Sequence, residues 1–197
     1  MRFRLFGTEI YLSFLFAALL TVMLATDKTG LVLPTFFAVF MHECGHLFAM
    51  WILGCAPKKI KLIPASVQIT NAAFTGYKND FLIAVSGPLV NFILFLAFYY
   101  NYSLFENRLV GYFALINLML GILNLLPVKG LDGGTVLFSI LCRITDINKA
   151  TLMLKIITLI LAVAIIVTAV FSTVRDKTNI SLYIMGIYLI VISVMKM

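Results

Sequence analysis

The chain has 197 residues, of which 62% are hydrophobic and 12% are charged, and its mean hydropathy is +1.08. An ordinary soluble domain carries about twice this share of charged residues, so the composition excludes a soluble globular protein and predicts a membrane protein. The formal net charge of +7 comes without a dense basic run interleaved with aromatic residues, which argues against nucleic-acid binding.

Several apolar segments are candidates for membrane spans, since crossing a bilayer takes roughly 20 mostly apolar residues. We count six: residues 10–25, 31–53, 81–100, 109–126, 151–171 and 180–195. The first could be a cleaved secretory signal, but it is long for such a signal and lacks a good cleavage site, so we expect a retained helix. We predict an all-α polytopic membrane protein with about six transmembrane helices, forming a single membrane-embedded domain over residues 1–197.

The basic residues favour one orientation of these spans. With the amino terminus inside, 4 of the 15 lysines and arginines lie on the outer side and the remaining 11 on the inner side; the outer ones are Lys28, Arg108, Arg175 and Lys177. The positive-inside rule therefore predicts a multi-pass protein of the cell membrane with both termini in the cytoplasm. The inner basic residues also indicate contact with anionic lipid.

The second segment contains the only two histidines of the chain, in the run His42-Glu43-Cys44-Gly45-His46. Ionisable residues at membrane depth are costly and usually functional. Two histidines four residues apart share one face of a helix, where both imidazoles can bind a single metal ion. Glu43 points to the side of that face and can reach a metal-bound water rather than the metal itself. We expect Cys44 only to pack between helices.

The stretch after this helix has a different pattern. Residues 59–63 alternate polar and apolar side chains, and Pro64-Ala65-Ser66 can turn the chain into residues 67–70. The pattern predicts a short membrane-associated β-hairpin after the second helix. An interfacial loop is the alternative. The edge of such a hairpin could bind an extended substrate by β-addition.

A catalytic zinc site needs a third protein ligand and an open fourth position. Among the acidic residues on the inner side, Asp132 stands out because it follows a break in the fourth segment, at Pro127 and Gly130. Such a break allows the carboxylate to turn inward instead of continuing as a span. We expect Gly133 and Gly134 to let the chain approach a metal closely.

The alternative is that Asp132 only caps a helix beginning near Thr135.

Together these motifs resemble those of the site-two proteases, a family of intramembrane zinc metalloproteases. The resemblance rests on H-E-x-x-H from His42 to His46, N-x-x-P-x-x-x-x-D-G from Asn124 to Gly133, and the small-residue motif ending at Asn91. It covers about residues 31–141, the expected catalytic core. The chain is similar to the compact six-helix branch that includes the stage IV sporulation protein FB, and we expect no regulatory carboxy-terminal domain like that of the sporulation protein.

The resemblance implies that His42, His46 and Asp132 hold Zn²⁺ and that Glu43 is the catalytic general base. It implies hydrolysis of peptide bonds within or next to transmembrane segments, with the active site toward the cytoplasmic leaflet.

The resemblance also places Asn124 by the active site, where it would contact the substrate or the transition state. A hydrogen bond to a neighbouring helix is the equal alternative, because a buried asparagine in a membrane bundle often bonds another helix. For Asn91 we prefer this structural interpretation.

The expected partner is a membrane protein substrate, for example a membrane-held transcription factor precursor, with a membrane protein as the regulator. A zinc-binding membrane scaffold or pseudoprotease without catalysis is the main alternative, but a pure binder has no use for Glu43 beside the metal. A cation transporter fits less well, because transporters usually show paired repeats, and here the polar residues gather at one depth.

Overall fold

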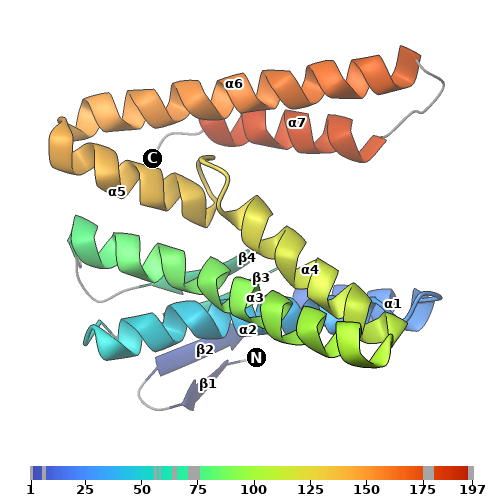
Figure 1. The fold of residues 1–197 in the computed structure, drawn as a ribbon. Helices are drawn as coiled ribbons and strands as arrows, with labels where there is room; N and C mark the ends of the chain where they lie inside the picture. The colour runs from blue at the N-terminus through green and yellow to red at the C-terminus, as the bar shows by residue number, and fades with distance from the viewer. Residues whose placement is uncertain are drawn as a thin grey trace. The chain divides into compact units, whose positions relative to one another are not determined.

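The computed structural model describes residues 2–5, 8–55, 57, 59–63, 66–70, 76–174 and 180–194. The chain divides into two compact units, residues 1–123 and residues 124–197. Figure 1 colours the first unit from blue through green to yellow and the second from yellow through orange to red. The prediction of a single domain over residues 1–197 stays a prediction.

Among the described helices, three are long and apolar enough to cross a membrane: α2 (Val32–Ile52), α3 (Tyr77–Phe105) and α6 (Ile147–Val174). Three apolar helices are shorter: α1 (Phe14–Thr26), α4 (Arg108–Asn124) and α7 (Ile180–Val194). Each lies within or overlaps one of the six apolar segments of the sequence. Many large apolar side chains on them are exposed, as lipid contact requires of a membrane protein.

The first unit contains a four-stranded sheet in the order β1 (Arg2–Leu5), β2 (Thr8–Leu12), β3 (Lys59–Ile63) and β4 (Ser66–Thr70). β1 and β2 pair antiparallel, and β2 and β3 pair parallel. A parallel pair needs a long crossover connection, and α1 and α2 supply it. β3 and β4 pair antiparallel in the segment predicted as a hairpin, and the residues that would join them, 64 and 65, lie outside the described residues.

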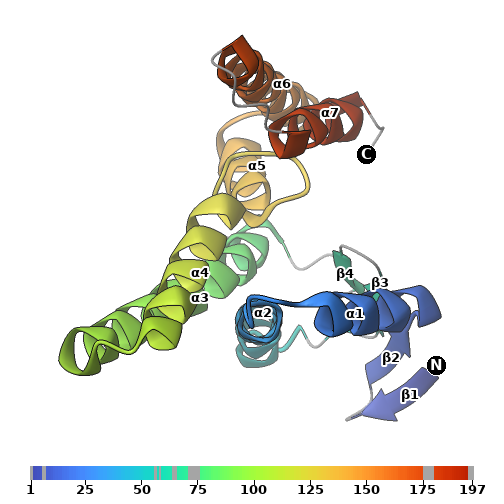
Figure 2. The ribbon, with the colours of Figure 1, turned by 90° about the vertical axis from the view of Figure 1, so that its right-hand side faces the viewer.

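The expected start of the first span at residue 10 is wrong, and the prediction of an all-α fold with one short β-hairpin misses β1 and β2. Residues 8–12 form β2, and α1 begins only at Phe14. The sequence Thr8-Glu9-Ile10-Tyr11-Leu12 runs directly into an apolar helix, so its apolar end merges with the helix in any hydropathy window. Helix α1 contacts β3 and so lies beside the sheet (Figure 2).

Helices α2 and α3 pack closely where two glycines cross. A Cβ atom at Gly45 of α2 would lie 2.8 Å from the carbonyl oxygen of Ser86 and 3.2 Å from the Cα of Gly87, both on α3. Small residues at such crossings let helix backbones approach each other in membranes. This contact brings the histidine face of α2 against α3.

The second unit consists of α5 (Asp132–Ile144), α6 and α7, preceded by the turn that follows α4. Its core contains Val128 from the turn, Ala162 of α6 and Leu189 of α7. The backbone N–H of Lys129 donates a 3.0 Å hydrogen bond to the hydroxyl of Thr158, which is fully buried on α6. The turn is therefore held against α6 by both apolar packing and a hydrogen bond.

Candidate metal centre

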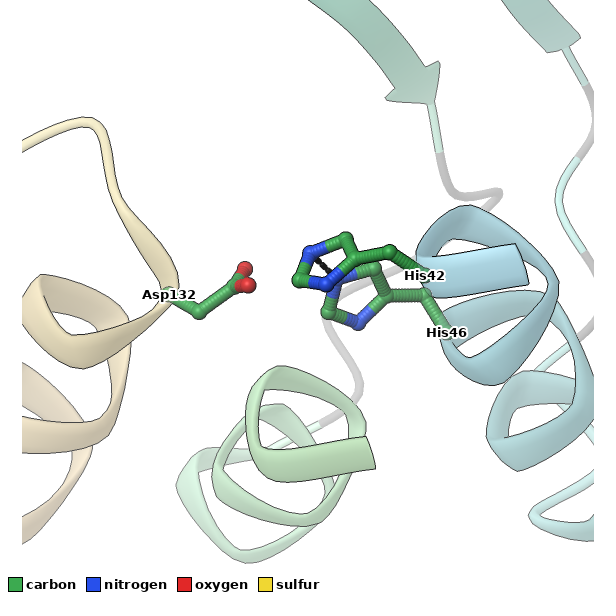
Figure 3. A group of neighbouring side chains, drawn as sticks. All are labelled: His42, His46 and Asp132. Carbon is green, nitrogen blue, oxygen red and sulfur yellow. Dashed lines mark hydrogen bonds between the residues drawn. The ribbon is translucent and has the colours of Figure 1, made fainter. Parts of the chain in front are cut away.

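Helix α2 brings His42 and His46 together on one buried face. Their side chains are 5% and 7% exposed, and their rings meet edge to face with centroids 4.7 Å apart. The two Nε2 atoms lie 3.1 Å from each other (Figure 3). The i, i+4 spacing of the sequence thus does what helix geometry predicts and points two imidazole nitrogens at one place.

The other nitrogen of each ring is held by α3. Nδ1 of His46 lies 2.7 Å from the backbone carbonyl oxygen of Ile83, and Nδ1 of His42 lies 2.5 Å from Oδ1 of Asn91. A carbonyl oxygen only accepts hydrogen bonds, so each Nδ1 must carry the proton and donate it. In a neutral imidazole, a proton on Nδ1 leaves the lone pair on Nε2, and the Nε2 atoms of His42 and His46 face each other.

Ile83 lies in α3 five residues before Pro88 and directly before Ala84, whose carbonyl loses its helical donor because proline has no N–H. The proline ring also distorts the turn before it, which opens nearby carbonyl groups to other donors. In membrane helices such groups are satisfied by neighbouring helices and by serine side chains. Here the Ile83 carbonyl accepts from His46 and also from the hydroxyl of Ser86, at 2.6 Å.

Two unprotonated imidazole nitrogens 3.1 Å apart repel each other unless a proton or another cation lies between them. Zinc binds imidazole nitrogen at about 2.0–2.1 Å, so two ligands of a tetrahedral site lie roughly 3.3–3.4 Å apart. The separation of the Nε2 atoms of His42 and His46 is close to this value. The residues of the first unit therefore fit one divalent metal ion held by two imidazoles.

Gly87 forms the floor under both rings. A Cβ atom there would clash with Nε2 of His46 and would lie 2.5 Å from Cε1 of His46 and 2.9 Å from Cε1 of His42. Only a residue without a side chain leaves room for both imidazoles. The small-residue motif of α3 thus shapes the metal centre itself, besides allowing the helices to pack.

Glu43 follows His42 in α2 and is half-buried. One residue along a helix turns the side chain by about 100°, so Glu43 leaves the helix beside the histidine face. This is the position of a proton acceptor next to a metal centre rather than of a third ligand.

In the second unit, Asp132 is the first residue of α5 (Figure 3) and is half-buried. Leu131 occupies the N-cap position, so the alternative in which Asp132 caps a helix beginning near Thr135 is wrong. A carboxylate in the first helical turn is favoured by the helix dipole, which helps to keep it ionised and able to bind a cation.

The glycines after Asp132 serve a purpose that differs from the expected one. A Cβ atom at Gly133 would clash with the carbonyls of Leu125 and Leu126, and one at Gly134 would clash with the carbonyl of Val128. The two glycines let the first turn of α5 pack on the preceding turn of the chain. They therefore fix the start of the helix that carries Asp132.

The break before Asp132 is as expected. Helix α4 ends at Asn124, and two local hydrogen bonds then hold the turn. The N–H of Val128 donates to the carbonyl of Leu126, and the N–H of Leu131 donates to the carbonyl of Val128. Gly130 has a φ of +94°, which a residue with a side chain rarely adopts. Asn124 itself is half-buried, and its contact with a substrate stays a prediction.

Two asparagines form the support of His42, and the sequence analysis missed this arrangement. Asn91 had been expected to bond a neighbouring helix, and it does so, but its Oδ1 also accepts from a histidine of the site. Asn117 of α4, which Asn91 contacts at 2.9 Å, had not been singled out at all. The available signal was an amide in the middle of the apolar run of residues 109–126, seven positions before Asn124.

Comparison with known proteins agrees with this geometry. Residues 102–169 match peptidase family M50. The chain is 29% identical over 161 residues to the "Zinc metalloprotease MJ0392" of Methanocaldococcus jannaschii (76% of this chain, 47% of the relative). It is 30% identical over 174 residues to the "Putative zinc metalloprotease sll0528" of Synechocystis (75% and 46%). It is 27% identical over 131 residues to the "Stage IV sporulation protein FB" of Bacillus subtilis (64% and 46%).

The chain thus spans about half the length of the curated relatives it matches. Among solved structures, it is similar to the site-2 protease from Methanocaldococcus jannaschii, with a TM-score of 0.71 and 26% identity. That match covers 98% of this chain and 93% of the solved chain.

Proposed function

Because this chain contains a domain of peptidase family M50, the family of the site-2 proteases, we propose that it is an intramembrane zinc metalloprotease. It hydrolyses peptide bonds within or next to transmembrane segments of membrane proteins. The observation that carries the proposal is the convergence of the Nε2 atoms of His42 and His46, 3.1 Å apart on one buried helix face, with both Nδ1 atoms hydrogen-bonded to α3.

Zn²⁺ is held by His42, His46 and Asp132 in this proposal. Two imidazoles and one carboxylate are a typical ligand set of catalytic zinc, and they leave the fourth position open. Asp132 is supported by its place at the start of α5, directly after the turn that interrupts the helical path. Two of the relatives are themselves named as zinc metalloproteases.

When bound, zinc supplies a Lewis acid that polarises a peptide carbonyl and makes a water molecule acidic enough to lose a proton near neutral pH. The carboxylate of Glu43 accepts the proton of the attacking water and returns it to the departing amine. Asn91 and the Ile83 carbonyl hold the two imidazoles in the tautomer that presents Nε2. Asn124 contacts the substrate near the reacting carbonyl.

The substrate is a membrane protein whose transmembrane helix can be opened locally, because the carbonyls of an intact helix are already hydrogen-bonded. The protein crosses the cell membrane about six times with both termini in the cytoplasm. The length and apolar character of α2, α3 and α6, and the distribution of basic residues, support this topology. A membrane-held transcription factor precursor is a substrate of the required kind, and a membrane protein partner regulates the cleavage.

The test compares the wild-type protein with the Glu43→Gln variant, in proteoliposomes with a fluorescent transmembrane substrate and in membrane proteomics. The variant should keep its zinc and lose cleavage by at least about 100-fold, because only the proton transfer is removed. Glu106→Gln is the matched control, since Glu106 is exposed at the end of α3. Full-length membrane proteins that accumulate only in the Glu43→Gln strain are the substrates. A Glu43→Gln strain with the full wild-type phenotype would contradict the protease function and would favour a zinc-binding scaffold.

A further inference from the structure

A chain of buried amides runs from α4 through α3 to His42. Nδ2 of Asn117 donates to the backbone carbonyl of Phe113 at 2.9 Å, and Nδ2 of Asn91 donates to Oδ1 of Asn117 at 2.9 Å. Oδ1 of Asn91 then accepts from Nδ1 of His42. Asn91 and Asn117 are both 0% exposed, so water does not compete for these groups.

The hydrogen bonds between these amides can run in one direction only, and a backbone carbonyl determines that direction. The carbonyl of Phe113 can only accept, so Asn117 must turn its NH₂ toward it and present its oxygen to Asn91. Asn91 must in turn present its NH₂ to Asn117, which leaves its oxygen for His42. If Asn91 were flipped, its oxygen would face the oxygen of Asn117 and the carbonyl of Ala38, which Nδ2 now contacts at 3.4 Å.

We propose that Asn117 is a positioning residue: through Asn91 it fixes the tautomer of His42 that carries its proton on Nδ1 and presents the Nε2 lone pair to the metal. The inference rests on the proposed zinc site and adds a residue to it that touches neither metal nor substrate. An outer partner that fixes the tautomer of a histidine ligand is typically worth 10- to 100-fold in metal affinity.

The two histidines differ in how they are oriented. His46 donates to a backbone carbonyl, which has no alternative orientation and needs no further support. His42 donates to the side-chain amide of Asn91, which can flip. The orientation of His42 therefore depends on Asn117, which holds that amide in place. Loss of Asn117 should thus change His42 and leave His46 as it is.

The protein is suited to a spectroscopic test because its sequence contains two histidines in all. Protein labelled with ¹⁵N-histidine gives one set of imidazole signals for each ring, and the ¹⁵N shifts report which nitrogen is protonated. Measured without metal at about pH 8.5, the wild type should show both rings protonated at Nδ1. Asn117→Leu should give a mixture of tautomers at His42 alone, and a roughly 10-fold weaker zinc affinity against a competing chelator.

Two further variants separate orientation from packing. Phe98→Leu removes the ring contact between Phe98 and Phe113, 4.6 Å between centroids, and so perturbs the same helix pair without touching an amide. It should leave the His42 signals and the zinc affinity unchanged. In an Asn91→Asp background both side-chain oxygens accept, so no flip can turn a donor toward His42 and Asn117→Leu should no longer alter its tautomer.

Unchanged His42 signals in Asn117→Leu would overturn the proposal and would mean that Ala38 alone holds Asn91. The same shift in Phe98→Leu would also overturn it, by pointing to a general movement of the helices. A wild-type protein that binds no zinc would refute the proposed function instead, and the metal-free tautomers would still decide the role of Asn117.

Discussion

Gly87 of α3 lies directly under the ring of His46, where a Cβ atom would come within 2.5 Å of Cε1. The floor of the metal centre is thus main chain, and main chain cannot move aside as a flexible side chain can. This relationship explains why a glycine is needed in the middle of a long apolar helix, where it otherwise costs helix stability.

Gly87→Ala should therefore displace the imidazoles. Overpacking of this kind costs about 1–3 kcal/mol, and here the strain falls on the two ligands. We expect the variant to be purified with little or no zinc, as measured by elemental analysis. Gly121→Ala is the control, because the atoms nearest to its Cβ would belong to the ring of Phe92, at 3.1 Å, and that side chain can adjust. A Gly87→Ala protein with a full complement of zinc would contradict this description of the site.

Asp132→Asn should weaken zinc binding by more than the 10- to 100-fold typical of outer-sphere residues, because a charged ligand is replaced by a neutral one. Cleavage should fall with it. Asp146→Asn provides the comparison, since Asp146 is exposed and pairs only loosely with Lys149, at 3.8 Å, an interaction worth little on a surface. Zinc titrations that give the same affinity for Asp132→Asn and the wild type would remove Asp132 from the ligand set.

Gly134→Ala should destabilise the second unit. The added Cβ would clash with the carbonyl oxygen of Val128 and lie 2.6 Å from its carbonyl carbon, and these backbone atoms are held against α6. The expected loss is about 1–3 kcal/mol of unfolding free energy, measured by denaturation in mixed micelles. Gly186→Ala should cost less, because its new Cβ would meet the side chain of Ile166, which can rotate. Equal losses of unfolding free energy in the two variants would show that the backbone of the turn before α5 can shift more easily than its hydrogen bonds indicate.

Asp27, in the loop between α1 and α2, should make stability depend on acid pH. The hydroxyl of Thr29 and the backbone N–H groups of Val32, Thr29 and Gly30 all donate to its carboxylate, and they hold its pKa below the usual value of 3.8. A carboxyl with a lowered pKa stabilises the folded state above pH 3.8, and this contribution is lost as the pH falls through the folded pKa. The difference in unfolding free energy between the wild type and Asp27→Asn should therefore be constant near neutral pH and shrink in acid. A difference that does not change with pH would contradict the hydrogen-bonded loop.

Local patterns predicted much of the site. The spacing of His42 and His46 requires one helix face whatever surrounds it, and Pro127 with Gly130 ends a helix by its own backbone chemistry. These features depend on a few neighbouring residues, so the sequence contains all that is needed to predict them.

The remaining features depend on residues far apart in the chain. β2 is stabilised by β3, which begins 47 positions after it ends, and its own five residues merge with the apolar helix that follows. Asn91 and Asn117 meet across 26 positions, and no periodicity of either helix indicates the partner. The glycines after Asp132 were assigned to the metal because their neighbours, the carbonyls of the turn, depend on a chain path that spacing does not predict.

The Ile83 carbonyl that receives His46 belongs to the polypeptide backbone, and no exchange of one amino acid at position 83 deletes it. The oxygen that receives His42 belongs to a side chain and can be replaced. Selection or protein engineering can therefore adjust the metal affinity in small steps by substitutions that alter the partner of His42. The hydrogen bond of His46 can be altered only by changing the backbone of α3.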